Sequence, residues 1–256
     1  MNKHKYYSLL TIICLFFLCS CVTKKELLYL QDIQALNNSK VISSKNILQE
    51  NDILKIDVTS LEINASIPYN KVTPANNFGN SLQLLQLNGY LVSINKTINF
   101  PVLGEISVAE KTSQDLEKYI KNLLEEGGHL INPRVTVRLL NSKVTILGEV
   151  RNPGTFTVTE KNISLLQALG LAGDLTIDGN RKNIIVIRES DGQRTTTNID
   201  LTSSSWLSSP YQNIQTNDVI IVNPNSKKIT SAGLIGNIST VLSIASILLS
   251  TIILIK

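Results

Sequence analysis

Residues 132–158 read NPRVTVRLLNSKVTILGEVRNPGTFTV, and this stretch decides the fold. The segment Val135–Leu139 alternates apolar and polar residues, which is the pattern of a strand that is buried on one face. A second strand begins at Val144, and the turn-rich segment Gly148–Gly154 follows it. Because this second strand opens a new unit with its own turns, we place a domain boundary between residues 141 and 142.

The residues before this boundary form the first predicted domain. We expect a strand at Ile53–Val58, because its β-branched residues follow the turn-forming pair Asn51-Asp52. A hairpin is expected over residues 90–105, with a turn at Asn95-Lys96 between Tyr90–Ile94 and Thr97–Phe100. The clearest helix starts after Thr112, which is spaced to form a capping box with Asp115. Strands around one helix predict an α+β fold.

The residues after the boundary form a second α+β unit. Ser164 and Gln167 have the spacing of a capping box and predict a short helix. A buried strand is expected at Ile184–Ile187, and a closing strand at Val219–Val222 follows another turn-forming pair, Asn217-Asp218. We interpret the aspartates of both turns as structural rather than as paired acids, because Asn and Asp at such corners bond to the local backbone.

The first 20 residues have the features of a secretory signal. Lys3 and Lys5 precede an apolar run, Leu9–Leu18, which is too short for a permanent membrane helix of about 20 residues. The sequence Leu18-Cys19-Ser20-Cys21 then resembles a bacterial lipobox, which implies cleavage before Cys21 and acylation of its sulfur. The alternative is an ordinary secretory signal whose cysteines are incidental.

Cleavage leaves Cys21 as the sole cysteine of the mature chain and His129 as its sole histidine. An acylated Cys21 offers no thiolate for catalysis, a metal or a disulfide. The formal charge falls from +4 to +2 when the two lysines of the signal are removed. No basic run marks a nucleic-acid-binding face, and Lys143, Arg151 and Arg181 are expected at the solvated surface. Since no HExxH, phosphate-loop or nucleophile-elbow motif is present, we predict no enzymatic activity, cofactor, metal site or nucleic-acid partner.

The segment Ile229–Ile255 is uncharged, and lysines bracket it at both ends. As a helix, this segment would reach roughly 40 Å, enough to cross a bilayer. One face carries small residues at spacings of 3, 4, 3 and 4, namely Gly236, Ser239, Ser243, Ser246 and Ser250. A repeat of 3.5 keeps this stripe aligned along a helix, so we predict that it lines a pore or mediates helix contacts.

A lone anchor helix is the alternative interpretation of this segment, with serines that bond back to carbonyls of their own helix. Because the lipid at Cys21 already supplies an anchor, assembly of several helices is favoured. The predicted organisation, in chain order, is a signal peptide (1–20), a lipidated tether (21–47), a first domain (48–141), a second domain (142–226) and a transmembrane helix (227–256).

Several passages resemble the domains of outer-membrane polysaccharide export (Wza-like) lipoproteins. The polysaccharide biosynthesis/export domain is similar to this chain at Gly89–Val92, Ile98–Gly104 and Asn132–Val137. The opening of a soluble-ligand-binding β-grasp (SLBB) domain is similar at Val144–Val150 and Asn152–Phe156, and its closing strand at Asn217–Ile220. The passages occur in the order that is specific to this family.

The resemblance implies a subunit of a homo-oligomeric outer-membrane channel that exports capsular polysaccharide or exopolysaccharide from the periplasm of a Gram-negative bacterium. It implies two small periplasmic α+β domains, a lipid anchor at Cys21, and C-terminal helices that surround a lumen lined by the small-residue stripe. The expected partners are other copies of the chain, the exported glycan, outer-membrane lipid and an inner-membrane polysaccharide copolymerase.

Two features depart from the family pattern. The Gly-Asp turns of the family appear as Asn51-Asp52 and Asn217-Asp218, and one β-grasp unit is present where longer members carry two. The second departure implies a shorter periplasmic body. The alternative function is a lipid-anchored glycan-binding module without channel activity, in which Trp206 would stack on a sugar. A periplasmic glycan hydrolase is a third hypothesis.

Overall fold

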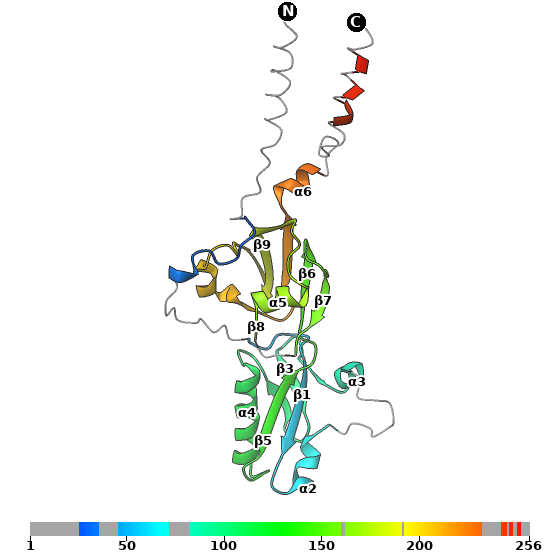
Figure 1. Cartoon of the computed structure of the whole chain (residues 1–256). Coiled ribbons are helices and arrows are strands. Elements are labelled where there is room, and N and C mark those ends of the chain that lie inside the picture. The colour runs from blue at the N-terminus through cyan, green and yellow to red at the C-terminus, as the bar shows by residue number, and fades with distance from the viewer. Residues whose placement is uncertain are drawn as a thin grey trace, which may run out of the picture.

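The computed structural model describes residues 26–35, 46–71, 82–159, 162–190, 192–231, 242–244, 246–247 and 250–251. Two α+β units lie end to end in the chain (Figure 1). We call residues 46–141 the first unit and residues 142–226 the second unit. Helix α2 (Ile63–Ser66) lies at the far end of the first unit, and helix α6 (Ser226–Ser231) lies at the end of the second unit that faces away from it (Figure 1). The sequence correctly predicts the mixed α+β character of both units.

A three-stranded antiparallel sheet in the order β2-β1-β5 organises the first unit. Helix α4 packs beside β5, and strands β3 and β4 form a separate hairpin (Figure 1). The elements are β1 (Ile53–Thr59), α2 (Ile63–Ser66), η3 (Ile67–Tyr69), α3 (Leu82–Leu87), β2 (Tyr90–Leu91), β3 (Thr97–Phe100), β4 (Gly104–Ser107), α4 (Ser113–Glu126) and β5 (Arg134–Leu139).

Helix α4 begins with the predicted capping box. The Thr112 side chain accepts a hydrogen bond from the Asp115 backbone N–H at 3.2 Å, and the Asp115 carboxylate accepts one from the Thr112 backbone N–H at 3.2 Å. Leu116, Ile120 and Leu124 recur at spacings of four residues, so they share one face of the helix and are fully buried. This face of α4 packs into the hydrophobic core of the first unit.

The predicted hairpin over residues 90–105 is wrong in its pairing. Strand β2 pairs with β1, where Tyr90 lies opposite Leu54, whereas β3 pairs with β4, where Phe100 lies opposite Gly104. Val102 adopts a φ of 66° in the turn between β3 and β4. The observed pairing brings the rings of Tyr90 and Phe100 together in the core, stacked with centroids 5.6 Å apart. The turn expected at Asn95-Lys96 is present, since the Ser93 backbone N–H donates to the Thr97 carbonyl at 2.9 Å, but β2 takes its ladder partner from β1.

The second unit contains a five-stranded sheet in the order β10-β9-β12-β6-β7. Its central pair, β12 and β6, is parallel, and the other pairs are antiparallel. Helix α5 begins with the predicted Ser164–Gln167 capping box and buries Leu165, Ala168 and Leu169. The elements are β6 (Lys143–Gly148), β7 (Gly154–Thr157), β8 (Ile163–Ser164), α5 (Leu165–Leu171), β9 (Gly179–Ser190), β10 (Gln193–Ile199), η4 (Ser205–Ser208), η5 (Pro210–Gln212), β11 (Asn213–Ile214) and β12 (Val219–Pro224).

Residues 26–35 of the predicted tether lie against the second unit. The backbone N–H of Leu30 donates to the Leu201 carbonyl at 3.0 Å, and that of Gln31 donates to the Thr202 carbonyl at 2.8 Å. The Tyr29 hydroxyl donates to Asp174 at 2.6 Å. Burial, together with this hydrogen bond, raises the pKa of Tyr29. The tether thus has specific contacts before its short helix η2 (Ile33–Ala35).

Helix α6 (Ser226–Ser231) continues from β12 at the end of the second unit (Figure 1). Most of the predicted transmembrane segment, 227–256, lies outside the described residues. The residues described between 242 and 251 are helical. Within the described part of the chain, no helix has the length and apolar character needed to cross a membrane.

Candidate functional site at the junction of the two units

Two turns with the same sequence pattern, which we call corners, face the junction of the two units at residues 141–143. Each unit supplies one of them. Gln49–Asp52 and Gln215–Asp218 both read Gln-x-Asn-Asp, and each precedes a central strand of its unit. Asn51 and Asn217 adopt φ values of 65° and 67°, the left-handed conformation that asparagine tolerates better than most residues. These corners confirm the structural interpretation of the two turns.

The two aspartates close their corners in the same way. The Asp52 carboxylate accepts a hydrogen bond from the Gln49 backbone N–H at 2.8 Å. The Asp218 carboxylate accepts the equivalent bond from the Gln215 backbone N–H at 2.8 Å. Both aspartates are buried, with 3% and 1% of their surface exposed. Each carboxylate therefore fixes the backbone at the entrance to a buried strand.

The linker between the units is hydrogen-bonded to both corners. The Asn141 side chain accepts from the Ile53 backbone N–H at 2.8 Å and donates to the Asn51 carbonyl at 2.8 Å. On the other side, the hydroxyl of Ser142 lies 3.0 Å from that of Thr216. The backbone N–H of Asn217 donates to the Lys143 carbonyl at 2.7 Å. The chain thus passes from one corner to the other within three residues.

The two aspartates differ in their charged surroundings. The Asp218 carboxylate forms a buried ion pair with Arg188, whose Nη2 lies 2.7 Å from Oδ2 and whose Nε also donates to the carboxylate. At Asp52, by contrast, burial raises the pKa of the carboxyl group to about 6, against the opposing effect of the hydrogen bond from Gln49. The same corner is therefore built once around an ion pair and once around a carboxyl group whose ionised form is destabilised by burial.

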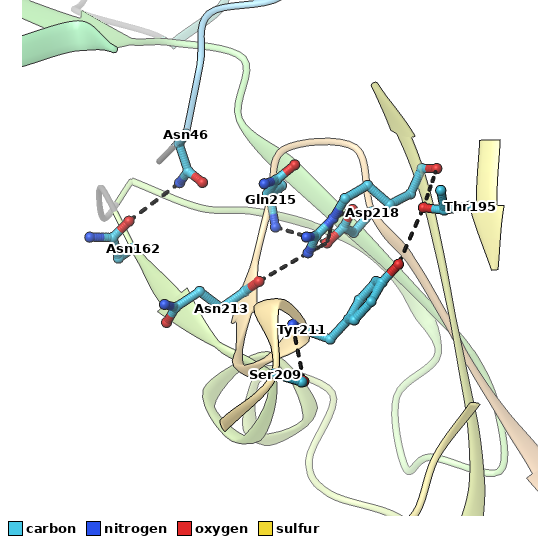
Figure 2. A network of polar contacts seen from close by, with 9 residues as sticks. Asn46, Asn162, Thr195, Ser209, Tyr211, Asn213, Gln215 and Asp218 are labelled. Atoms are coloured by element: carbon cyan, nitrogen blue, oxygen red, sulfur yellow. Dashed lines mark hydrogen bonds and ion pairs between the residues drawn. The ribbon is translucent and has the colours of Figure 1, made fainter. Parts of the chain in front are cut away.

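Arg188 connects the second corner to a wider polar network (Figure 2). Its Nη2 donates to the Asn213 carbonyl at 3.0 Å, and its guanidinium lies 4.8 Å from the centroid of the Tyr211 ring. The Tyr211 hydroxyl donates to the Thr195 hydroxyl at 3.3 Å. Contacts with the Thr195 and Thr197 hydroxyls lower the pKa of Tyr211. The network ties strands β9, β10, β11 and β12 together at the junction.

A cleft of about 1230 Å³ lies around this junction. Both units line it, and the amides of Asn46 and Asn162 approach each other across it at 3.4 Å (Figure 2). The described lining mixes hydroxyl, amide and charged groups with aliphatic side chains such as Leu48, Val137 and Leu139, and none of these described residues is aromatic. The charged side chains are Glu50, Asp52, Lys96, Arg138, Lys143, Glu189 and Arg194. Such a surface offers hydrogen bonds to a polyhydroxylated ligand without the stacking platform of a tight sugar site.

Within the described residues, no group of three or more His, Cys, Asp or Glu side chains is placed to hold a metal ion.

Comparison with known proteins identifies the family. Residues 41–140 match the family model described as polysaccharide biosynthesis/export protein, and residues 143–198 match the model of the SLBB domain. The EPS I polysaccharide export outer membrane protein EpsA of Ralstonia nicotianae is 33% identical over 106 residues, which cover 40% of this chain and 27% of the relative. The capsule polysaccharide export outer membrane protein CtrA of Neisseria meningitidis is 28% identical over 160 residues, 61% of this chain and 39% of that protein.

The chain belongs to the outer-membrane polysaccharide export family. Both relatives are named as polysaccharide export outer membrane proteins. The alignments span only 27% and 39% of the lengths of these two relatives.

The predicted site residues of this export protein lie far from the junction in sequence. Cys21, Gly236 and Ser239 fall outside the described residues. Ser243, Ser246 and Ser250 are exposed and helical. The Ser246 hydroxyl donates to the Leu242 carbonyl at 2.7 Å, and the Ser250 hydroxyl donates to the Ser246 carbonyl. In the protomer these two hydroxyls are thus bonded to their own helix.

Sequence reasoning identified the two corners but missed the ion pair and the link between the units. The Asn-Asp pair of each corner predicts the turn, and the glutamine two residues before each pair repeats in the sequence as well. Arg188 carries no comparable signal, because it lies 30 residues from Asp218 and pairs with it only through the β9–β12 contact. Trp206 is 6% exposed, so it packs in the second core instead of presenting a ring to a sugar.

Proposed function

We propose that this export protein is a subunit of a homo-oligomeric outer-membrane channel for capsular polysaccharide or exopolysaccharide. The proposal rests on one observation, the order of two export-family domains followed by a long uncharged segment with a stripe of small residues. Because one helix cannot enclose water, the stripe has a transport role only where several copies stand together. The proposed partners are other copies, the glycan, outer-membrane lipid and an inner-membrane copolymerase.

In the proposed arrangement, Cys21 is acylated and the two units occupy the periplasm. The C-terminal segment crosses the outer membrane as a helix, with Gly236, Ser239, Ser243, Ser246 and Ser250 towards the lumen or a neighbouring helix. Hydroxyl groups along a water-filled passage form weak, repeated hydrogen bonds with a moving glycan, and conduction requires such weak contacts. The polar and charged groups of the junction cleft, whose described lining holds no aromatic ring, are compatible with the same transient binding.

Two variants of the C-terminal segment test this proposal. The double substitution Ser243→Leu and Ser246→Leu places two bulky apolar groups on the stripe, and we expect it to abolish export at an unchanged protein level. The matched control is Ile244→Leu and Ile247→Leu, which alters neighbouring positions off the stripe and should leave export intact. Normal export by the double serine variant would contradict pore lining at these positions.

Particle imaging and surface labelling test assembly and membrane crossing separately. Detergent-purified protein should form rings, and a tag placed after Lys256 should be reachable from outside intact cells. Monomeric particles with a protected tag would instead favour the lipid-anchored binding module. The burial of Trp206 weighs against that alternative, because it removes the stacking residue that the binding module requires.

A further inference from the structure

The loop between α5 and β9, residues 174–179, carries an isolated exposed isoleucine. Ile177 has 72% of its surface exposed, whereas Leu175, two residues earlier, is 4% exposed. A single exposed apolar residue is ordinary on a protein surface and needs further observations to suggest a role. Ile177 lies in a loop that is hydrogen-bonded on both sides and is linked to α6.

The backbone on the N-terminal side of Ile177 is held firmly by other elements. Asp174 accepts a hydrogen bond from the Tyr29 hydroxyl at 2.6 Å and another from the Leu175 backbone N–H at 2.7 Å. The Thr176 hydroxyl donates to the Glu149 carboxylate at 2.8 Å, and its backbone N–H donates to the Glu149 carbonyl at 2.9 Å. The tether and the end of β6 therefore fix this half of the loop.

The C-terminal side of the loop is held equally well. Asp178 forms an ion pair with Lys228 of α6 at 3.1 Å. The buried Arg181 guanidinium donates to the Thr176 and Gly179 carbonyls at 3.4 and 3.2 Å. Since both halves of the loop are bonded, the Ile177 side chain projects from a rigid support. A rigid support reduces the entropy that is lost when an exposed side chain enters a contact.

Asn225 joins this isoleucine to the start of the uncharged C-terminal segment. The Asn225 side chain donates to the Ile177 carbonyl at 3.2 Å, and its backbone N–H donates to the Asp178 carbonyl at 2.7 Å. The Asn225 carbonyl accepts from the backbone N–H of Ile229, the first residue of the uncharged segment, which is 61% exposed. Asn225 therefore links Ile177 to Ile229 of α6, and α6 lies at the end of the second unit that faces away from α2 (Figure 1).

The tether places the lipid-bearing end of the chain close to the same loop. Tyr29, which contacts Asp174, follows Cys21 by eight residues. Even a fully extended chain of this length spans only about 28 Å. Lys227, which is exposed and adjacent to the loop contact, suits the phosphate groups of anionic lipids, which attract basic residues beside a membrane segment.

We propose that Ile177 and Ile229 insert into the periplasmic leaflet of the outer membrane and seat the second unit against phospholipid. The two side chains contact the lipid at the boundary between headgroups and acyl chains. Exposed apolar side chains next to lysines are buried at this boundary when a protein binds a membrane. This inference rests on the proposed outer-membrane location but does not require a channel. It assigns the loop a role in setting how close the second unit stands to the membrane.

A single fluorescent label tests the proposal in the full-length, acylated protein. Ile177→Cys is labelled with an environment-sensitive dye, and the protein is reconstituted into vesicles of phosphatidylethanolamine and phosphatidylglycerol. The matched control is Ile131→Cys, an isoleucine that is 86% exposed in the loop between α4 and β5 of the first unit. Wild-type protein, whose Cys21 sulfur carries lipid, serves as the unlabelled blank.

We expect the emission of the label at residue 177 to shift to the blue. Lipids with brominated acyl chains should quench this label, and aqueous iodide should not reach it. The label at residue 131 should behave in the opposite way.

Iodide quenching at both positions would overturn the proposal. A label at residue 177 that neither quencher reaches would also overturn it, because that result indicates a protein neighbour. Flotation with the vesicles distinguishes these outcomes from a failure of membrane anchoring, which would defeat both proposals. Lipid quenching in a protein that fails the export test would leave this inference standing.

Discussion

Replacing Asp52 or Asp218 by asparagine should change the stability of the protein in opposite directions at pH 8. The two residues occupy equivalent corners, and both accept a hydrogen bond from a glutamine backbone N–H at 2.8 Å. An asparagine side chain retains an oxygen that can accept this bond. The two substitutions therefore differ mainly in the charge that each removes.

For Asp52 the buried charge is unfavourable. Burial raises its pKa from 3.8 to about 6. Each unit of pKa corresponds to about 1.36 kcal/mol, so at pH 8 the ionised carboxylate costs the folded state about 3 kcal/mol relative to its neutral form. The stabilising contribution of the neutral form is fully present below pH 3.8 and is lost as the pH rises through about 6. Asp52→Asn should remove this dependence on pH and stabilise the first unit at pH 8.

For Asp218 the buried charge has a partner. Removing the carboxylate leaves the Arg188 guanidinium buried, with its side chain 9% exposed and its anionic partner gone. Breaking a buried ion pair in this way costs about 3–5 kcal/mol. Asp218→Asn should therefore destabilise the second unit at pH 8, which is the opposite of the effect expected at Asp52.

Hydrogen exchange measured by mass spectrometry follows the two units separately in the full-length protein. Peptides that contain β1 (Ile53–Thr59) report on the first unit, and peptides that contain β12 (Val219–Pro224) report on the second. Comparison of exchange at pH 5 and pH 8, corrected for the intrinsic rates, gives the pH dependence of each unit. If Asp52→Asn weakened protection of β1 at pH 8 and left its pH dependence unchanged, the argument from burial would be refuted.

Two further substitutions test local features of the fold by urea unfolding. A Cβ at Gly148, where φ is 88°, would lie 2.1 Å from the Val222 carbonyl oxygen, so Gly148→Ala should destabilise the second unit by about 2–5 kcal/mol. Gly154→Ala is its control, because a Cβ there meets no atom within 4 Å, and an equal loss in both variants would contradict the steric argument. Thr112→Ala removes the cap of α4 and should cost about 1 kcal/mol, whereas Thr112→Ser keeps an acceptor oxygen. Equal stability of the alanine and serine variants would show that the cap contributes nothing.

Features set by neighbouring residues were predictable from the sequence. Both capping boxes depend on side chains three positions apart, and both form as the spacing indicates. The two corners depend on the ability of asparagine to adopt a positive φ, which is also a local property. The mixed α+β character follows from the succession of such local signals.

Features set by distant residues were not predictable in the same way. The turn of the predicted hairpin forms, but its strand pairing was wrong because Tyr90 gains a partner strand in β1 and β3 pairs with β4. Arg181 was expected at the solvated surface, yet it is 8% exposed. It bonds two carbonyls of the 174–179 loop, and its guanidinium lies 5.4 Å from the centroid of the Tyr29 ring. Neither the carbonyls nor the tether that brings Tyr29 can be recognised from the surroundings of Arg181 in the sequence.

The junction restricts how a protomer of the proposed channel can change shape. A rotation between the units at residues 141–142 would have to stretch the bonds of Asn141 to Asn51 and Ile53 or those of Ser142 and Lys143 to the second corner. Hinges are usually segments that absorb changes in φ and ψ without losing such contacts. The left-handed backbone of each corner is also closed by a buried aspartate, so the corners are poor sites for bending. We therefore expect the two units of one protomer to move as one body, and any widening of the passage for a glycan to occur between subunits.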